Sequence, residues 1–175
     1  LIDDGWTLRN DLIWHKPNGM PESVTDRFSK KFEYIFMLVK NEKYYFDLDA
    51  IREKSSSENR LRNKNNEDCN NGYLSNRFSK GIRPEQHPLG KNPGDVWQIN
   101  TQPSTEKHYA MWPKKLVERM VLCSTKEDDI ILDPFCGSAT TLKVAIKNNR
   151  QAIGIDLGYS DIQERKLNNI QKNII

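Results

Sequence analysis

Apolar residues gather in two short runs near the start of the chain. Residues 11–14 form the run Asp-Leu-Ile-Trp, and residues 32–39 form a longer run rich in aromatic and branched side chains. Pro17 follows the first run and biases Lys16 away from helix, so a turn is expected there. A continuous apolar run is typical of a strand with both faces covered. The pattern therefore predicts two strands, the second buried on both faces.

Helical spacing appears next in the last third of the chain. Leu116, Val117, Met120 and Val121 share one helical face, and Pro113 stands where the first turn of a helix accepts proline. We expect a helix of about three turns here, since apolar positions repeat over about that length.

A strand, a turn, a helix and a second strand are predicted in the segment that follows. Residues 128–133 form the first strand and 152–156 the second, with a helix from Ala139 to about Lys147 and Ser138 as its N-cap. The apolar stripe of this helix is Leu142, Val144, Ala145 and Ile146. Such a βαβ unit implies a parallel sheet. The tail, residues 161–173, is predicted to be a polar helix with one apolar stripe.

The middle of the chain differs in composition. Between Ile51 and Asn92 there are nine Lys or Arg against five Asp or Glu, seven Asn, and little apolar periodicity. Either a solvated surface loop or a basic, amide-rich arm that follows phosphates would have this composition. We therefore divide a single domain into amino-terminal strands (1–50), an insert that could recognise a target (51–95) and a cofactor-binding part (96–175).

Length and composition narrow the class of protein. With 175 residues, 36% of them apolar, and a net charge of +3, the chain fits one globular domain and not a collagen or a disordered chain. No apolar stretch is long enough for a membrane helix, so no membrane partner is expected. Three cysteines without CxxC spacing argue against disulfides, and the cytoplasm is the expected compartment. A first residue other than Met indicates an internal fragment or incomplete reading frame.

Two aspartates follow the two strands of the predicted βαβ unit. Asp133 and Asp156 are 23 residues apart, close to the spacing at which a second carboxylate binds ribose hydroxyls, and Gly137 lies in the turn between strand and helix. Neither GxGxxG nor a phosphate-loop lysine is present. A ligand with a ribose and no pyrophosphate fits this pattern, although any βαβ protein can carry a Gly and an Asp at such positions.

Several motifs in order resemble one enzyme family. Residues 132–141, LDPFCGSATT, resemble the S-adenosylmethionine motif of DNA amino-methyltransferases that act on adenine N6 or cytosine N4. Residues 154–156 resemble the next motif, and HYAMWP at 108–113 resembles the helix entry before the cofactor loop. The segments WHKPN (14–18), MPES (20–23), DRF (26–28) and EYIF (33–36) resemble a run of short motifs in this family and occur in the same order. The motifs occur in the β-group order and cover most of the chain.

The resemblance implies a Rossmann-like, S-adenosylmethionine-dependent methyltransferase fold. Its cofactor-binding residues would be Asp133, Pro134, Phe135, Gly137, Ser138, Thr140, Asp156, His108 and Pro113. Double-stranded DNA would be the substrate, with the target base flipped out of the helix, and Lys16 and Asn18 are candidates to face it. No metal is expected, since His15 and His87 lack ligands at metal spacing.

One motif of this family is absent from the sequence. The family holds the flipped base with an Asp/Ser/Asn-Pro-Pro-aromatic tetrapeptide, and this chain contains no Pro-Pro step. In the β-group order that motif precedes Trp14, so the family sheet, 3-2-1-4-5-7-6, would lack strands 4 and 5 here. We expect the isolated chain to be inactive unless another polypeptide, upstream in the family order, completes the sheet. The alternative is a non-catalytic methyltransferase-like subunit that binds DNA or a partner.

Two residues of the cofactor motif leave alternatives open. Cys136 could be a nucleophile, but a small buried filler fits its surroundings in the sequence better. The family usually has Gly where this chain has Ala139. If that position needs a positive φ, alanine costs about 1 kcal/mol or more, whereas in a helical conformation alanine is harmless.

Overall fold

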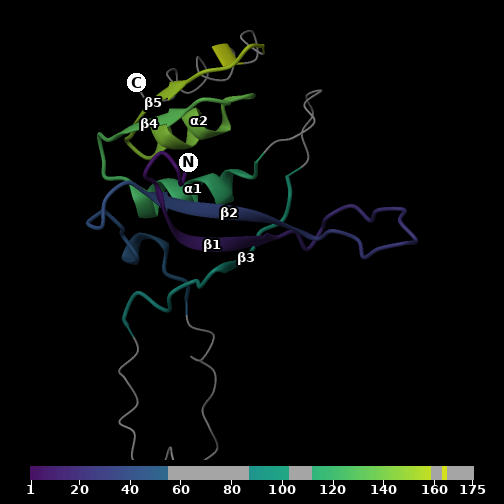
Figure 1. Cartoon of the computed structure of the whole chain (residues 1–175). Helices are drawn as coiled ribbons and strands as arrows, with labels where there is room; N and C mark the ends of the chain where they lie inside the picture. The colour runs from purple at the N-terminus through teal and green to yellow at the C-terminus, as the bar shows by residue number, and fades with distance from the viewer. Residues whose placement is uncertain (55–86, 103–111, 159–162, 165–175) are drawn as a thin grey trace, which may run out of the picture. The chain divides into compact units, whose positions relative to one another are not determined.

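The computed structural model describes residues 1–54, 87–102, 112–158 and 163–164 (Figure 1). The chain divides into two compact units, residues 1–51 with 93–175, and residues 52–92. In the described part of the smaller unit, Glu53 and Lys91 form an antiparallel bridge. Most of the predicted insert and of the predicted carboxyl-terminal helix lies outside the described residues. No helix in the described ranges is both long and apolar enough to cross a membrane.

A three-stranded sheet forms from the amino-terminal residues and one later strand. Strand β1 (Thr7–His15) pairs antiparallel with β2 (Phe32–Val39) and parallel with β3 (Val96–Gln98), in the order β2-β1-β3. A register shift between Leu8 and Asn10 interrupts the first ladder. The two predicted strands are confirmed, although β1 begins earlier than its apolar run. A short 3₁₀ helix, η1 (Asp49–Ile51), follows β2.

Two tryptophans form the centre of this sheet's core. Trp14 and Trp97 are buried with Ile99 and Leu116 in one cluster. The Trp14 indole N–H donates to the carbonyl of Ile99 at 2.8 Å, so its polar atom is satisfied. The sequence did not predict β3, because a strand of three residues is too short for an alternation to be recognised.

The predicted βαβ unit is confirmed. Strands β4 (Ile130–Asp133) and β5 (Gln151–Gly154) pair in parallel, and α2 (Thr140–Lys147) connects them. Helix α2 buries Leu142, Val144 and Ala145. These elements form a two-stranded sheet that is not hydrogen-bonded to the β2-β1-β3 sheet within the described residues.

Helix α1 (Lys114–Ser124) contacts the cores of both sheets, and it confirms the predicted three-turn helix. Leu116 joins the tryptophan cluster, whereas Val117 and Val121 pack with Val144 of α2 and with Ile131 of β4. The two sheets and two helices form a partial Rossmann-like α/β fold, as expected.

Two local predictions were wrong. Strand β2 is covered on one face only: Tyr34 and Phe36 are more than half exposed, because no described element packs over them. Ser138 does not cap α2. The N-cap position is Ala139, at φ 61° and ψ 31°, and no side chain caps the helix there. The left-handed turn at Ala139 shifts the start of the helix by one residue.

Candidate functional site

The two candidate aspartates lie at the same edge of the β4-β5 sheet. Asp133 is the last residue of β4 and pairs with Gly154 at the end of β5. The Ile155 N–H donates to the Asp133 carbonyl at 2.9 Å, which extends the ladder to the residue before Asp156. Because parallel strands end at one edge, both carboxylates face the region where ligands bind in open α/β sheets.

The turn after β4 is held by these carboxylates. An Asp133 carboxylate oxygen accepts a hydrogen bond from the Phe135 N–H at 3.1 Å. Asp156 reaches across from the other strand and accepts from the Gly137 N–H at 2.8 Å. Gly137 has φ 48°, a left-handed conformation that glycine adopts without strain. The other carboxylate oxygen of Asp156 accepts from the Gly158 N–H at 2.9 Å, so Asp156 positions the turn and the residues that follow β5.

A further residue of this site was missed from the sequence. The Gln163 side-chain amide donates to the Gly137 carbonyl at 2.8 Å and lies 3.5 Å from the Cys136 sulfur. Gln163 thus secures Gly137 from its carbonyl side, while Asp156 secures it from its amide side. One glutamine in a polar stretch carries no sequence signal for such a role.

The turn packs tightly against β5. A Cβ added at Gly154 would lie 2.8 Å from the Cys136 sulfur and 2.9 Å from a methyl carbon of Leu142. Cys136 is buried, and burial raises the pKa of its thiol, with Asp133 and Asp156 adding to the effect. A protonated, buried thiol agrees with the filler role and not with a nucleophile.

The remaining candidate residues occupy different environments. Pro134 and Phe135 are exposed, with Phe135 89% accessible, whereas Ser138 is buried and its hydroxyl lies 3.4 Å from that of Thr140. Pro113 is fully buried at the N-cap position of α1. His108 lies outside the described residues.

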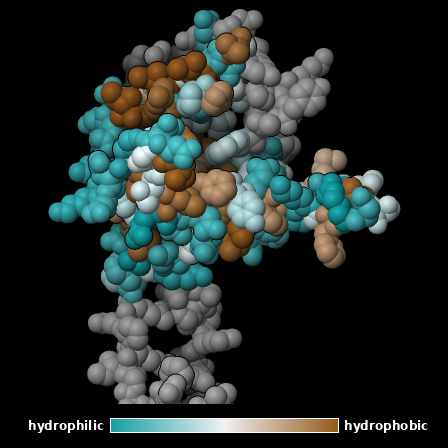
Figure 2. All heavy atoms as spheres, viewed as in Figure 1, coloured by the Kyte–Doolittle hydropathy of each residue, from teal (hydrophilic) through white to brown (hydrophobic). Residues whose placement is uncertain are grey.

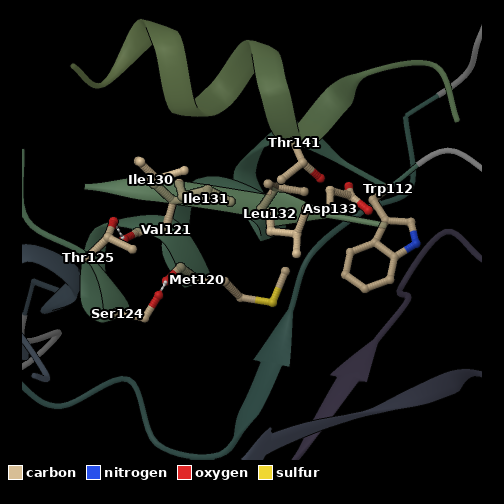
Figure 3. A pocket seen from close by; sticks show the side chains of 11 residues that line it. Trp112, Met120, Val121, Ser124, Thr125, Ile130, Ile131, Leu132, Asp133 and Thr141 are labelled. Carbon is tan, nitrogen blue, oxygen red and sulfur yellow. Dashed lines mark hydrogen bonds between the residues drawn. The ribbon is translucent and has the colours of Figure 1, made fainter. Parts of the chain in front are cut away.

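A groove of about 330 Å³ runs between α1 and β4 (Figure 3). Apolar side chains of both elements line most of it, including Met120, Val121 and Ile131. Asp133, Thr141 and the half-exposed Trp112 lie together at one end, as Figure 3 shows. One candidate carboxylate thus lies at the mouth of an apolar groove.

The charge of the turn restricts its ligands. Residues 133–139 contain no Lys or Arg, so this turn has no side chain to neutralise a pyrophosphate. The carboxylates of Asp133 and Asp156, with the exposed ring of Phe135 in the same turn, instead suit a ligand that carries hydroxyls and positive charge. Within the described ranges, no three His, Cys, Asp or Glu side chains gather as they would around a metal ion.

The two candidate DNA-facing residues are engaged elsewhere. The Lys16 ammonium pairs with Glu33 and lies 4.5 Å from the centre of the Trp14 ring. The Asn18 amide donates to the Thr101 carbonyl at 3.0 Å and accepts from the Thr101 N–H at 2.8 Å. Both side chains therefore stabilise the chain around β1 and β3, and contact with DNA stays a prediction.

Comparison with known proteins identifies the family. A family model described as DNA methylase, of the N6/N4 methyltransferase group, matches residues 1–165. The chain belongs to this N6/N4 DNA methylase family. The match spans the motifs on both sides of the insert, and it confirms the family resemblance.

Curated relatives include Type II methyltransferases from bacteria. M.Cfr9I of Citrobacter freundii is 38% identical over 177 residues, covering 100% of this chain and 49% of the relative. M.SmaI of Serratia marcescens is 35% identical over 169 residues, covering 95% and 48%. The chain thus spans about half the length of these relatives.

Solved structures share the fold. The cytosine-N4-specific PvuII DNA methyltransferase superposes with a TM-score of 0.63 at 20% identity, covering 99% of this chain and 59% of that one. The complex of M1.HpyAVI with S-adenosylmethionine gives 0.58 at 22% identity, covering 95% and 65%. These likenesses establish a methyltransferase-type α/β fold for the N6/N4 DNA methylase chain.

Proposed function

We propose that this chain is the cofactor-binding part of a Type II DNA amino-methyltransferase. The proposal rests on one observation. Asp133 and Asp156 lie at the ends of adjacent parallel strands at one edge of the sheet, and both accept hydrogen bonds from backbone N–H groups of the turn between β4 and α2. The cofactor would be S-adenosylmethionine, and the acceptor the exocyclic amine of adenine or cytosine in DNA. The Type II relatives and the S-adenosylmethionine complex of a fold neighbour support this proposal.

The residues of the turn fit this cofactor chemically. Carboxylates accept hydrogen bonds from ribose hydroxyls, and their negative charge favours the sulfonium and ammonium groups of S-adenosylmethionine. The turn, residues 133–139, contains no Lys or Arg, and a ligand without phosphates does not require these cations. The exposed ring of Phe135 offers an apolar surface for an adenine.

The protein's part in the reaction is chiefly positioning. When bound, the cofactor supplies an activated methyl group, so the enzyme has to align the amine with it and exclude water. Asp156 and Gln163 fix Gly137 from two sides, which keeps the turn in one shape. Asp133, at one end of the apolar groove, would accept hydrogen bonds from a ribose or from the ammonium group of the methionine portion.

Catalysis by the isolated chain is not part of this proposal. The sequence has no Pro-Pro step to hold a flipped base. We infer that methyl transfer requires a second stretch of polypeptide with that motif. Incorporation of labelled methyl groups into mixed-sequence DNA tests this inference, since turnover by the chain alone would contradict it.

The cofactor assignment is tested by calorimetric titration with S-adenosylmethionine. We expect the chain to bind it, and Asp133→Asn to weaken binding about tenfold or more, because a charged hydrogen bond contributes about 1.5–3 kcal/mol. Asp3→Asn is the matched control, since Asp3 is an exposed aspartate remote in sequence from the turn. Absence of binding by the wild-type chain, or equal affinity in both variants, would refute the assignment.

A further inference from the structure

A second cleft, of about 590 Å³, lies at the end of the β1-β2 pair where β1 begins and β2 ends. It shares no lining residue with the groove between α1 and β4, and none with the turn of residues 133–139. Its volume is within the range of clefts that bind small molecules. Charged, amide and aromatic side chains contribute to its walls, including Arg9, Asn41, Glu42, Lys43, Tyr44 and Phe46.

Arg9 enters this cleft from an irregularity of the sheet. Leu8 pairs with Leu38 and Asn10 pairs with Met37, so Arg9 is an extra residue that no β2 residue opposes. A β-bulge of this kind redirects side chains away from the regular alternation of a strand, and bulges are frequent beside functional sites. The bulge therefore gives the Arg9 side chain a direction that a regular strand would not give it.

Tyr44, in the segment after β2, holds the arginine in place. The Arg9 Nε donates a hydrogen bond to the Tyr44 hydroxyl at 2.8 Å. Among the described residues, neither the terminal nitrogens of Arg9 nor the Tyr44 O–H has an acceptor, and no carboxylate pairs with Arg9. A guanidinium held beside a hydroxyl presents adjacent donors in a fixed geometry, which suits the oxygens of an anion.

The charge of the lining favours a phosphate among the possible anions. Arg9 and Lys43 are cations, whereas Glu42 carries the opposite charge. A phosphate monoester has nearly two negative charges at neutral pH and three acceptor oxygens, so it can use both cations and the Tyr44 hydroxyl. A carboxylate has one charge and would leave part of this donor set without an acceptor.

The aromatic residues indicate what the phosphate is attached to. Tyr44 is 39% exposed and Phe46 is 43% exposed, so their rings are accessible from the cleft. Nucleobases stack on such rings, and the Asn41 amide can both donate to and accept from the edge of a base. Figure 2 shows apolar side chains at the surface over β4 and β5, and mostly hydrophilic ones around the segment that follows β2. This surface suits a polar ligand that contains a ring.

We propose that the cleft binds a nucleoside phosphate, with the phosphate on Arg9, Lys43 and Tyr44 and the base against the aromatic residues. The nucleotide is either free or the phosphorylated end of a nucleic-acid strand, because both present the same group. The inference goes beyond the proposed function, since it adds a nucleotide site to the cofactor turn. The turn has carboxylates and no cation, whereas the cleft has cations, so the two sites select different ligands.

Calorimetric titration of the chain with each of the four ribonucleoside 5′-monophosphates tests the site. We expect at least one of them to bind with a Kd below about 1 mM, equally well with and without saturating S-adenosylmethionine. The same nucleoside without phosphate, and inorganic phosphate alone, should each bind about tenfold more weakly or worse, because each lacks half of the contacts. A short 5′-phosphorylated single strand is the second probe, and its affinity relative to the free nucleotide distinguishes the two sources.

Substitutions assign the binding to the cleft. Arg9→Gln and Tyr44→Phe should each weaken nucleotide binding about tenfold or more, since each removes a donor to the phosphate. Lys115→Gln is the matched control, because Lys115 is an exposed cation on α1 and does not line the cleft. Tryptophan fluorescence reports whether each variant is folded. Lys43→Gln, in an exposed turn, is the second variant if Arg9→Gln does not fold, with an expected loss of about threefold or more.

The outcomes separate this inference from the cofactor assignment. Nucleotide binding that Arg9→Gln and Tyr44→Phe weaken, and that Lys115→Gln and Asp133→Asn leave unchanged, supports the proposal. Absence of binding by all four nucleotides and the phosphorylated strand would overturn it. Competition between the nucleotide and S-adenosylmethionine would also overturn it, because the ligand would then occupy the cofactor turn. If the chain does not bind S-adenosylmethionine, the nucleotide titrations still decide whether the cleft is a site.

Discussion

Ala139 carries the clearest local strain among the residues of the candidate site. Its side chain is fully buried, and its backbone is in the left-handed conformation at φ 61°. The family motif that residues 132–141 resemble usually has glycine at this position. Relief of the left-handed strain by glycine, about 1–2 kcal/mol, is opposed by the lost methyl burial and the greater freedom of the unfolded chain. The three effects are similar in size, so they nearly cancel.

This balance predicts a contrast between two buried alanines. Ala139→Gly should change the free energy of unfolding by less than about 1 kcal/mol, whereas Ala145→Gly, within α2, should lower it by about 2 kcal/mol. Ala145 is also fully buried, so each of the two substitutions removes one buried methyl group. Urea denaturation of both variants gives the comparison. Equal losses at the two positions would contradict a left-handed Ala139.

The thiols predict a pH dependence of reactivity. Burial raises the pKa of Cys123 to about 11 and raises that of Cys136, with nearby carboxylates contributing to the latter. Since the thiolate is the reactive form, both should react slowly with a disulfide reagent at pH 8, and Cys123 should gain reactivity only as the pH approaches 11. The rate in urea, where both thiols are exposed, is the control. Rapid labelling of native Cys136 at pH 8 would revive the nucleophile hypothesis.

At the scale of elements, Arg150 connects the end of α1 to the start of β5. Its guanidinium donates to the Thr125 carbonyl at 2.8 Å and to the Thr125 hydroxyl at 3.3 Å. Arg150→Ala should lower the free energy of unfolding by about 1–3 kcal/mol, because a half-buried carbonyl loses a charged donor. Thermal melts of this variant and of Lys115→Ala, an exposed cation on α1, measure the effect. A loss no larger than that of Lys115→Ala would show that the contact is unimportant.

Elements with a strong local pattern were predictable from sequence. Apolar spacing predicts helices α1 and α2 and strands β4 and β5. The order of these elements also predicts that Asp133 and Asp156 lie at one edge of a parallel sheet. The exposure of one face of β2 was not predictable, because an apolar run shows that a strand suits burial and not which of its faces another element covers. Gln163 was missed and the conformation of Ala139 stayed open between two alternatives, because each depends on contacts across the fold and not on its neighbours in sequence.

At the scale of the whole molecule, α1 is the element that joins the cores of two separate sheets. Its Leu116 belongs to the tryptophan cluster, and Val117, the next residue, belongs to the cluster with α2. The βαβ part and the amino-terminal sheet are therefore stabilised through one shared helix.

The close contact at Gly154 has an evolutionary consequence. A single added carbon there would press on the sulfur of Cys136 and on Leu142, and through them on the bend that ends at Ala139. A side chain at 154 therefore requires the Cys136 or Leu142 side chain to move, since the ends of these two are the atoms that it would meet. Relatives that carry a larger residue at 154 should accordingly differ at Cys136 or Leu142 as well, so that the three positions vary as a group.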